Sequence, residues 1–139
     1  MIRTFMTSCL LLIMFVVSDA QSVINAQLDR VAEILKYDGY SLTHDLEYAS
    51  LNDGQSDYYS ITLRKGYDYK IVAVCDADCG DMDLKIYDEN GNLIDSDAES
   101  DDTPIVSIIP KWTGEYELWV KMYDCNINPC RFGIAVFGK

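Results

Sequence analysis

The stretch GEYELWVKM, residues 114–122, decides the fold of this chain. Its even-numbered residues from Tyr116 to Met122 are apolar, and its odd-numbered residues are charged apart from Trp119. Strict alternation of this kind is typical of a β-strand with one face in a core and the other in solvent. The stretch therefore predicts a strand that buries Tyr116, Leu118, Val120 and Met122.

Shorter segments on both sides of this strand carry the same signal. Alternating or short apolar runs occupy residues 58–63, 69–75, 83–87, 93–94, 105–109 and 132–136. Turn residues separate them, and Asn90-Gly91 is the strongest short signal for a hairpin. About seven short strands at this spacing predict an all-β fold, an antiparallel, jelly-roll-like β-sandwich.

One segment at the N-terminus has helical periodicity instead. Residues 22–37 place Ile24, Leu28, Val31 and Leu35 on one face, which predicts a single short α-helix within residues 21–40. Ser22 is the predicted N-cap, and Asp38-Gly39 is a stop signal. We expect this helix to lie against the sandwich.

The first twenty residues resemble a secretory signal peptide. Arg3 precedes an apolar run at residues 10–17, and small residues at positions 18 and 20 favour cleavage before Gln21. We therefore expect a signal peptide at 1–20, a helix at 21–40 and a sandwich domain at 41–139. The predicted location is secreted, either extracellular or periplasmic.

The net charge of the chain argues against two classes of binding partner. The formal net charge is −12, and cleavage would remove one basic and one acidic residue, leaving it unchanged. An excess of acidic residues disfavours binding to nucleic acid, because a partner of nucleic acid must neutralise its phosphates. It equally disfavours binding to an anionic membrane surface. We expect a monomer that contacts neither.

Four cysteines remain after the predicted cleavage, in two close pairs. The favoured pairing is Cys75–Cys79 and Cys125–Cys130, because each pair spans a short turn between strand-like segments. Adjacent strands would also allow cross-pairing, and spacing alone leaves both arrangements open. An exported chain favours disulfides over a zinc site.

The first cysteine pair lies in CDADCGDMD, residues 75–83, which concentrates acidic side chains. Closely spaced carboxylates can supply the oxygen ligands that Ca²⁺ requires, so the candidate metal ligands are Asp76, Asp78, Asp81 and Asp83. The alternative is that these side chains cap turn amides. The acidic run at residues 95–102 is interpreted as a solvated loop that could supplement such a site.

The sequence contains little that predicts catalysis. His44 is the single histidine, and no Gly-x-Ser-x-Gly motif accompanies it. We therefore predict that the chain is not an enzyme and needs no catalytic cofactor. Trp119, Tyr87 and Tyr123 lie on the predicted outer strand faces, where they form either a binding platform or cross-strand packing.

Three segments resemble the pre-peptidase C-terminal (PPC) domain family of bacteria. They are SL at 50–51 followed by DYYSITL at 57–63 and GYDY at 66–69, then DLKIYD at 83–88, and TGEYELWV at 113–120. The resemblance covers roughly residues 45–138. It implies a β-sandwich module of the kind found at the C-terminus of secreted proteases, and related collagenase modules bind collagen and calcium.

The expected function is therefore a secreted, non-catalytic accessory module that acts on an extracellular protein or polysaccharide, with Ca²⁺ as a stabilising ion. Two alternatives stay open. A secreted protease inhibitor would present the loop at 126–129, between Cys125 and Cys130. A small extracellular hydrolase would need two carboxyl groups whose pKa values are pushed apart in a cleft.

Overall fold

A computed structural model describes residues 19–139 of the chain. The predicted signal peptide lies outside the described residues except for Asp19 and Ala20, which begin the helix α1, Asp19–Tyr37. Because α1 begins at Asp19, Ser22 lies inside its first turn, so the prediction of Ser22 as the N-cap is wrong for this chain. Within the described part, no helix is both long and apolar enough to span a membrane.

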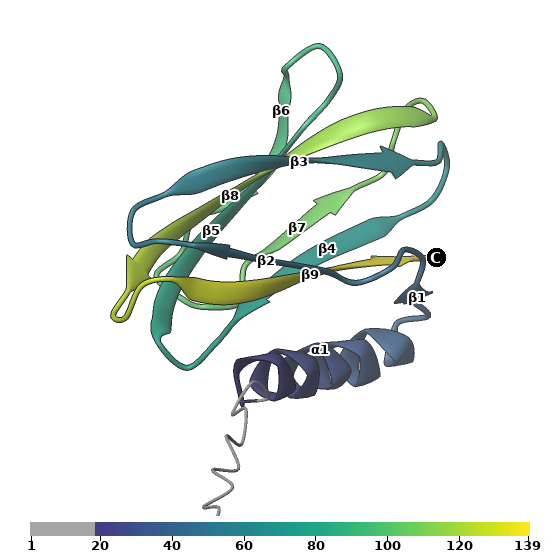
Figure 1. Cartoon of the computed structure of the whole chain (residues 1–139). Coiled ribbons are helices and arrows are strands. Elements are labelled where there is room, and N and C mark those ends of the chain that lie inside the picture. Colours follow the sequence, from purple (N-terminus) through teal and green to yellow (C-terminus); the bar gives the residue numbers. More distant parts are fainter. Residues whose placement is uncertain (1–18) are drawn as a thin grey trace, which may run out of the picture.

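Nine strands follow the helix in the described chain and form two antiparallel sheets (Figure 1). One sheet has the order β1-β9-β4-β7, with β2 also pairing with β9, and the other has the order β3-β8-β5-β6. The strands are β1 (Ser41–Leu42), β2 (Glu47–Leu51), β3 (Ser56–Leu63), β4 (Tyr69–Cys75), β5 (Cys79–Tyr87), β6 (Leu93–Asp97), β7 (Ile105–Ile108), β8 (Gly114–Cys125) and β9 (Cys130–Gly138). The predicted antiparallel sandwich is confirmed.

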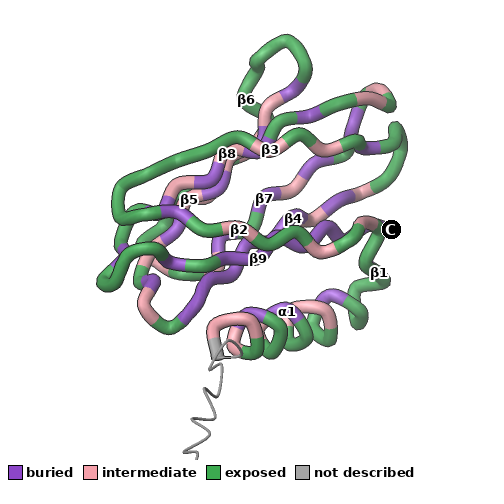
Figure 2. The backbone as a smooth tube through the Cα atoms, viewed as in Figure 1, coloured by how far each residue is buried: buried purple, intermediate pink, exposed green. Residues whose placement is uncertain are grey.

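The main core lies between the two sheets, where inward residues from both form one cluster (Figure 2). On β8, Tyr116, Leu118, Val120 and Met122 are all buried, as their alternation predicts. Apolar area removed from water stabilises by about 25 cal/mol per Å², so the burial of this face stabilises the sandwich.

A second core lies on the outer face of the sheet that contains β4 and β9, where α1 covers it (Figure 1). Ile24 and Leu28 of α1 pack in one cluster with Val72 and Val74 of β4. The helix is further tied to the sheet by Gln27, whose Nε2 donates to the carbonyl oxygen of Cys75 at 2.7 Å. The expectation that the helix lies against the sandwich is confirmed.

Two predicted turns have the expected backbone. Gly39 ends α1 with a φ of 86°, and Gly91 has a φ of 79° in the turn between β5 and β6. Residues with a side chain rarely adopt positive φ, which explains glycine at both positions. The Asn90-Gly91 hairpin is therefore confirmed.

The two open sides of the sandwich differ. At one side β6 and β7 lie close together, and acidic side chains of β6 reach the backbone of β7. At the other side β3 is the edge strand of its sheet, and its inward residues Tyr59 and Ile61 are only partly buried. A groove opens there, described below.

Candidate functional site

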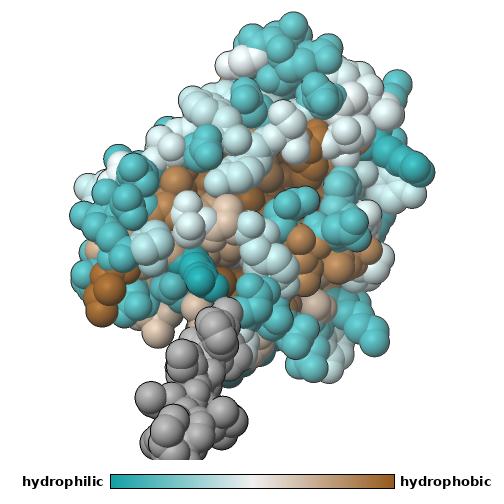
Figure 3. Space-filling model, viewed as in Figure 1, coloured by the Kyte–Doolittle hydropathy of each residue, from teal (hydrophilic) through white to brown (hydrophobic). Residues whose placement is uncertain are grey.

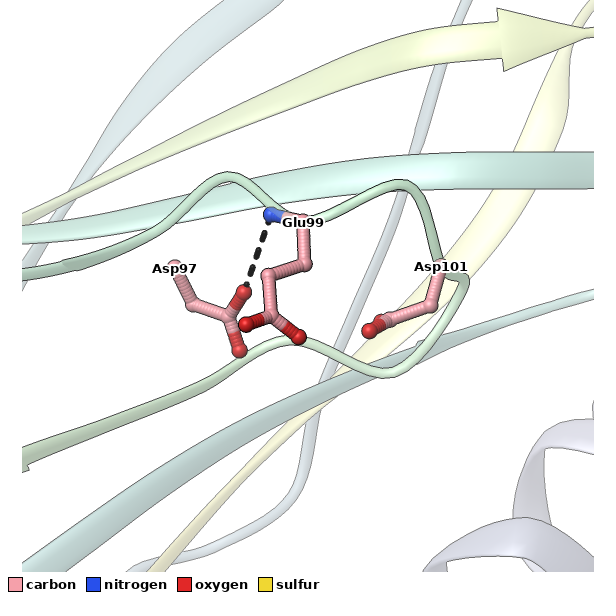
Figure 4. A group of neighbouring side chains, drawn as sticks. All are labelled: Asp97, Glu99 and Asp101. Atoms are coloured by element: carbon pink, nitrogen blue, oxygen red, sulfur yellow. Dashed lines mark hydrogen bonds between the residues drawn. The ribbon is translucent and has the colours of Figure 1, made fainter.

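Carboxylates gather where the chain leaves β6. Asp97 ends β6, and Glu99 and Asp101 follow in the loop towards β7, with carboxylate oxygens of all three within 4.8 Å of one another. Their side chains converge on one side of the loop (Figure 4). Three converging carboxylates form a group that could hold a metal ion.

Backbone hydrogen bonds fix this loop against β5. The N–H of Met82 donates to the carbonyl oxygen of Asp101 at 2.9 Å, so the loop runs alongside β5 beyond the last β5–β6 pair. Asp97 holds the loop at its base, where Oδ1 accepts from the N–H of Glu99 at 3.2 Å and Oδ2 from that of Ile105 at 2.9 Å.

Asp81 of β5 belongs to the same acidic region. Its Oδ1 is buried and has no hydrogen-bond partner among the described residues. Burial raises the pKa of Asp81, and the negative charges of Asp83, Asp101, Asp124 and Asp97 raise it further. We define the acidic corner as the converging group Asp97, Glu99 and Asp101 together with Asp81 and Asp83 of β5, on whose pKa values Asp97 and Asp101 act.

Asp83 is the member of the acidic corner with nearby cations. Burial raises its pKa, and Asp97 and Asp101 add to this, while Lys121 and Lys85 act in the opposite direction. Lys121 is the cross-strand neighbour of Asp83 on β8. The charge of Asp83 is thus partly compensated, whereas the charges that act on the pKa of Asp81 are all carboxylates and add to the effect of burial.

The structure separates the four predicted metal ligands. Asp76 is buried, and its carboxylate accepts from the N–H of Asp78 at 3.2 Å and from that of Arg131 at 2.8 Å, which is the turn-capping role considered as the alternative. Asp78 remains on the turn between β4 and β5. Asp81 and Asp83 lie on β5, where the charges of Asp97 and Asp101 raise their pKa values.

The chemistry of the acidic corner suits a hard divalent cation. Ca²⁺ takes six to eight oxygen ligands. Asp97, Glu99 and Asp101 offer carboxylate oxygens within 4.8 Å of one another, and their region also includes Asp81 and Asp83, whose pKa values respond to Asp97 and Asp101. Unneutralised carboxylates in a partly buried setting repel one another, and a divalent ion would remove that cost. Oδ1 of Asp81, which has no hydrogen-bond partner within residues 19–139, is an oxygen atom that could also serve as a ligand.

Both favoured disulfides are present and lie close to this region. Cys75–Cys79 closes the turn between β4 and β5, and Cys125–Cys130 closes the turn between β8 and β9, each with Cα atoms 5.9 Å apart. Cys79 and Cys125 are register partners on β5 and β8, so the strand ends lie side by side, yet the local pairs form. The first disulfide contacts the acidic loop, where Cys75 Sγ lies 3.6 Å from the carbonyl oxygen of Asp102.

His44 links the two sheets at the side opposite β6 and β7. Its Nε2 lies 2.7 Å from the carbonyl oxygen of Thr62, and its Nδ1 lies 2.8 Å from Oγ1 of Thr43. The same hydroxyl lies 3.2 Å from the carbonyl oxygen of Val136. Each ring nitrogen of His44 therefore lies within hydrogen-bond distance of a partner, one on the main chain and one on a threonine side chain.

The outer face of the β3-β8-β5-β6 sheet carries a row of residues in register. Tyr58 of β3 is the cross-strand partner of Trp119 on β8, which is in turn the partner of Lys85 on β5. Nζ of Lys85 lies 4.7 Å from the centre of the Trp119 ring, and Tyr58 is 54% exposed. Tyr87 and Tyr123 lie on the same outer face, and Tyr123 packs under Lys121. Tyr58 was not among the outer aromatic residues predicted from the sequence, because its place in the row depends on the cross-strand register.

Comparison with solved structures places this fold. The structure matches the crystal structure of the pre-peptidase C-terminal domain of collagenase from Bacillus anthracis with a TM-score of 0.52. The two sequences are 19% identical, and the match covers 66% of this chain and 87% of that one. The chain has a fold similar to that of a PPC domain.

The PPC-like fold agrees with the resemblance seen in the sequence. No family model matches the sequence, and no curated protein matches it significantly. At 19% identity the similarity establishes the fold alone. The acidic corner and the outer aromatic row are therefore features whose roles rest on the residues of this chain.

Proposed function

We propose that this chain is a secreted, non-catalytic accessory module that binds an extracellular protein or polysaccharide and is stabilised by Ca²⁺. The observation that carries the proposal is the similarity of its fold to the PPC domain of a collagenase. Two disulfides agree with an oxidising compartment, and the signal-like segment at 1–20 agrees with export.

The binding face that we assign is the outer row of Tyr58, Trp119 and Lys85. Aromatic rings on a sheet surface offer a large apolar contact area at little cost in side-chain entropy, and they accept sugar rings or peptide groups over their faces. The register fixes the spacing of the two rings, so the row is preorganised for a partner.

Binding to a panel of insoluble polysaccharides and fibrous extracellular proteins tests this assignment. We expect the wild-type protein to be retained on at least one of them, and Tyr58→Ala and Trp119→Ala to abolish retention. Tyr37→Ala is the matched control, because Tyr37 is 93% exposed on α1, far from the row. No retention of the wild type, or equal retention of all three variants, would refute the assignment.

The acidic corner is the Ca²⁺ site that we propose. Asp81 and Asp83 come from the set predicted by sequence, and Asp97, Glu99 and Asp101 complete it. The site lacks the dedicated loop of a high-affinity sensor, so we expect a dissociation constant of about 10⁻⁴–10⁻³ M, typical of extracellular modules. Asp76 lies outside the group of carboxylates that converge beside β6, and its oxygens accept from the N–H groups of Asp78 and Arg131, so we leave it out of the site.

One observation favours protease inhibition as a second function. Ile127 is 65% exposed at the tip of the loop closed by Cys125 and Cys130, where a protease cleft could receive it. Inhibition assays against serine, cysteine and metalloproteases test this function, with Ile127→Asp as the variant that must lose inhibition. Glycan-hydrolysis assays of the wild type test the hydrolase alternative in parallel.

A further inference from the structure

A groove of about 660 Å³ opens between β3 and the segment that joins β1 to β2. Its floor is apolar and comes from both sheets, with Ile61 and Leu118 on one side and Ile134 and Val136 on the other. Apolar residues are visible between β3 and β2 on this face of the molecule (Figure 3). His44 lines the groove and, through its contact with Thr62, joins its two walls.

The backbone of β3 is available along this groove. In an antiparallel strand the N–H and C=O of one residue point to the same side, and the side alternates along the chain. The carbonyl of Thr62 is bound by His44 across the open edge, and the N–H of Tyr58 is bound by the side chain of Asp57. Both contacts show that the main-chain N–H and C=O groups of the even-numbered residues of β3 point to the open edge, although their side chains lie on the outer face of the sheet. Ser60 therefore presents an N–H and a C=O that have no partner in the described chain.

The charge of the groove is one-sided. Asp45 and Glu47 form its rim opposite β3, and Asp57 lies just beyond it on β3. The residues that line the groove include no lysine or arginine. A complementary partner therefore combines apolar side chains for the floor with positive charge for the rim.

We propose that this groove binds an extended, basic polypeptide segment of a partner protein, which pairs as an added strand with β3 at Ser60. Addition of a strand to an exposed edge gives affinity through main-chain hydrogen bonds, and pockets for alternate side chains give specificity. The apolar side chains of the segment cover Ile61 and Ile134, and its lysines or arginines approach Asp45 and Glu47. This site is separate from the outer aromatic row, so the proposal does not depend on the proposed function and is tested separately from it.

Fluorescence anisotropy with synthetic peptides tests the proposal. The probe is a labelled peptide in which valine and lysine alternate, compared with peptides of equal length that alternate valine with glutamate or serine with lysine. We expect the valine–lysine peptide alone to bind. Equal binding of the serine–lysine peptide would show that charge alone attracts it, and no binding of any peptide would also overturn the proposal.

Two variants locate the bound peptide. Glu47→Lys reverses a rim charge, and Ser60→Pro removes the free N–H at an edge position where proline does not disturb pairing with β8. We expect each to weaken binding at least about tenfold, whereas Glu115→Lys, on the outer face of β8, leaves binding unchanged. Melting temperatures near that of the wild type show that the variants are folded. Binding of the valine–lysine peptide to both variants as tightly as to the wild type would contradict the proposal. A wild-type dimer that Glu47→Lys converts to monomers would also contradict it, because a second copy of this chain would then fill the groove.

Discussion

Asp95 of β6 accepts a hydrogen bond from the backbone N–H of Ser107 on β7, with Oδ2 and the nitrogen 2.8 Å apart. Two residues along each strand, Asp97 accepts from the N–H of Ile105 at 2.9 Å. These two carboxylates take the place of a neighbouring strand at the free edge of β7. They close this side of the sandwich and shield an edge that would otherwise be open to pairing with another chain.

We predict that Asp95→Ala destabilises the domain by about 1–3 kcal/mol, because it leaves the N–H of Ser107 without an acceptor. Urea unfolding measures the change in the free energy of unfolding. Ser96→Ala is the control, because Ser96 is exposed between the two aspartates, and it should change stability by less than about 0.5 kcal/mol. Equal stability of the two variants would show that the contact between β6 and β7 contributes nothing.

Gly133 of β9 lies directly against α1, with no room for a side chain. A Cβ there would lie 2.8 Å from Cγ2 of Ile24 and 3.4 Å from Cδ1 of Leu28. We predict that Gly133→Ala costs about 1–3 kcal/mol in thermal or denaturant unfolding, because the helix must shift outward. Ile24→Ala removes the clashing methyl group, so the double variant should lose less stability than the two single variants added together. Strict additivity would contradict this packing.

The acidic corner predicts an unusual dependence of stability on pH in EDTA. The pKa of Asp81 is raised in the folded state, so the folded protein binds that proton more tightly than the unfolded chain. The free energy of unfolding should therefore rise as the pH falls from 7 through the raised pKa towards the ordinary value near about 4. Asp81→Asn should raise the melting temperature at neutral pH and weaken this rise.

Asp88 has the opposite effect on the free energy of unfolding, and this effect falls at lower pH. Hydrogen bonds from Asn92 and Asn90 lower the pKa of Asp88, so its contribution is present above the unfolded value and lost as the pH falls through the folded one. Melting temperatures in EDTA should thus pass through a maximum in mild acid. A melting temperature that falls steadily from neutral pH downward would contradict the raised pKa of Asp81.

Removal of Cys125 and Cys130 together by alanine substitution should cost about 2 kcal/mol, because the loop that they close is short. The β-rich circular-dichroism spectrum should persist, since both sheets keep their pairing. Mass spectrometry of a non-reduced digest should give one peptide pair linked by Cys75–Cys79 and one linked by Cys125–Cys130. A peptide that joins Cys75 to Cys125 would show a different pairing.

The sandwich was predictable because the alternation along β8 lies within one continuous segment of sequence. The helix was predictable for the same reason, from the spacing of Ile24, Leu28 and Leu35. It missed the second core. Val72 and Val74 alternate with residues of the main core, and only the position of α1 shows that both faces of β4 are buried.

The candidate metal site was predictable only in part for the same reason. Asp81 and Asp83 were singled out by their density with Asp76 and Asp78 along the chain. Asp97 and Asp101 join them because the β6–β7 loop runs beside β5, which is a long-range contact that spacing does not encode. Asp76 was indistinguishable from its neighbours until the structure showed its bond to the N–H of Arg131.

The acidic corner is tested most directly by the melting temperature of the domain between EDTA and several millimolar Ca²⁺. If Ca²⁺ binds only the folded state, the melting temperature must rise with its concentration by mass action. We predict such a rise for the wild type and for the controls Asp78→Asn and Glu115→Gln, and a much smaller rise for Asp81→Asn and Glu99→Gln. A melting temperature that is the same in EDTA and in Ca²⁺ would contradict the calcium site.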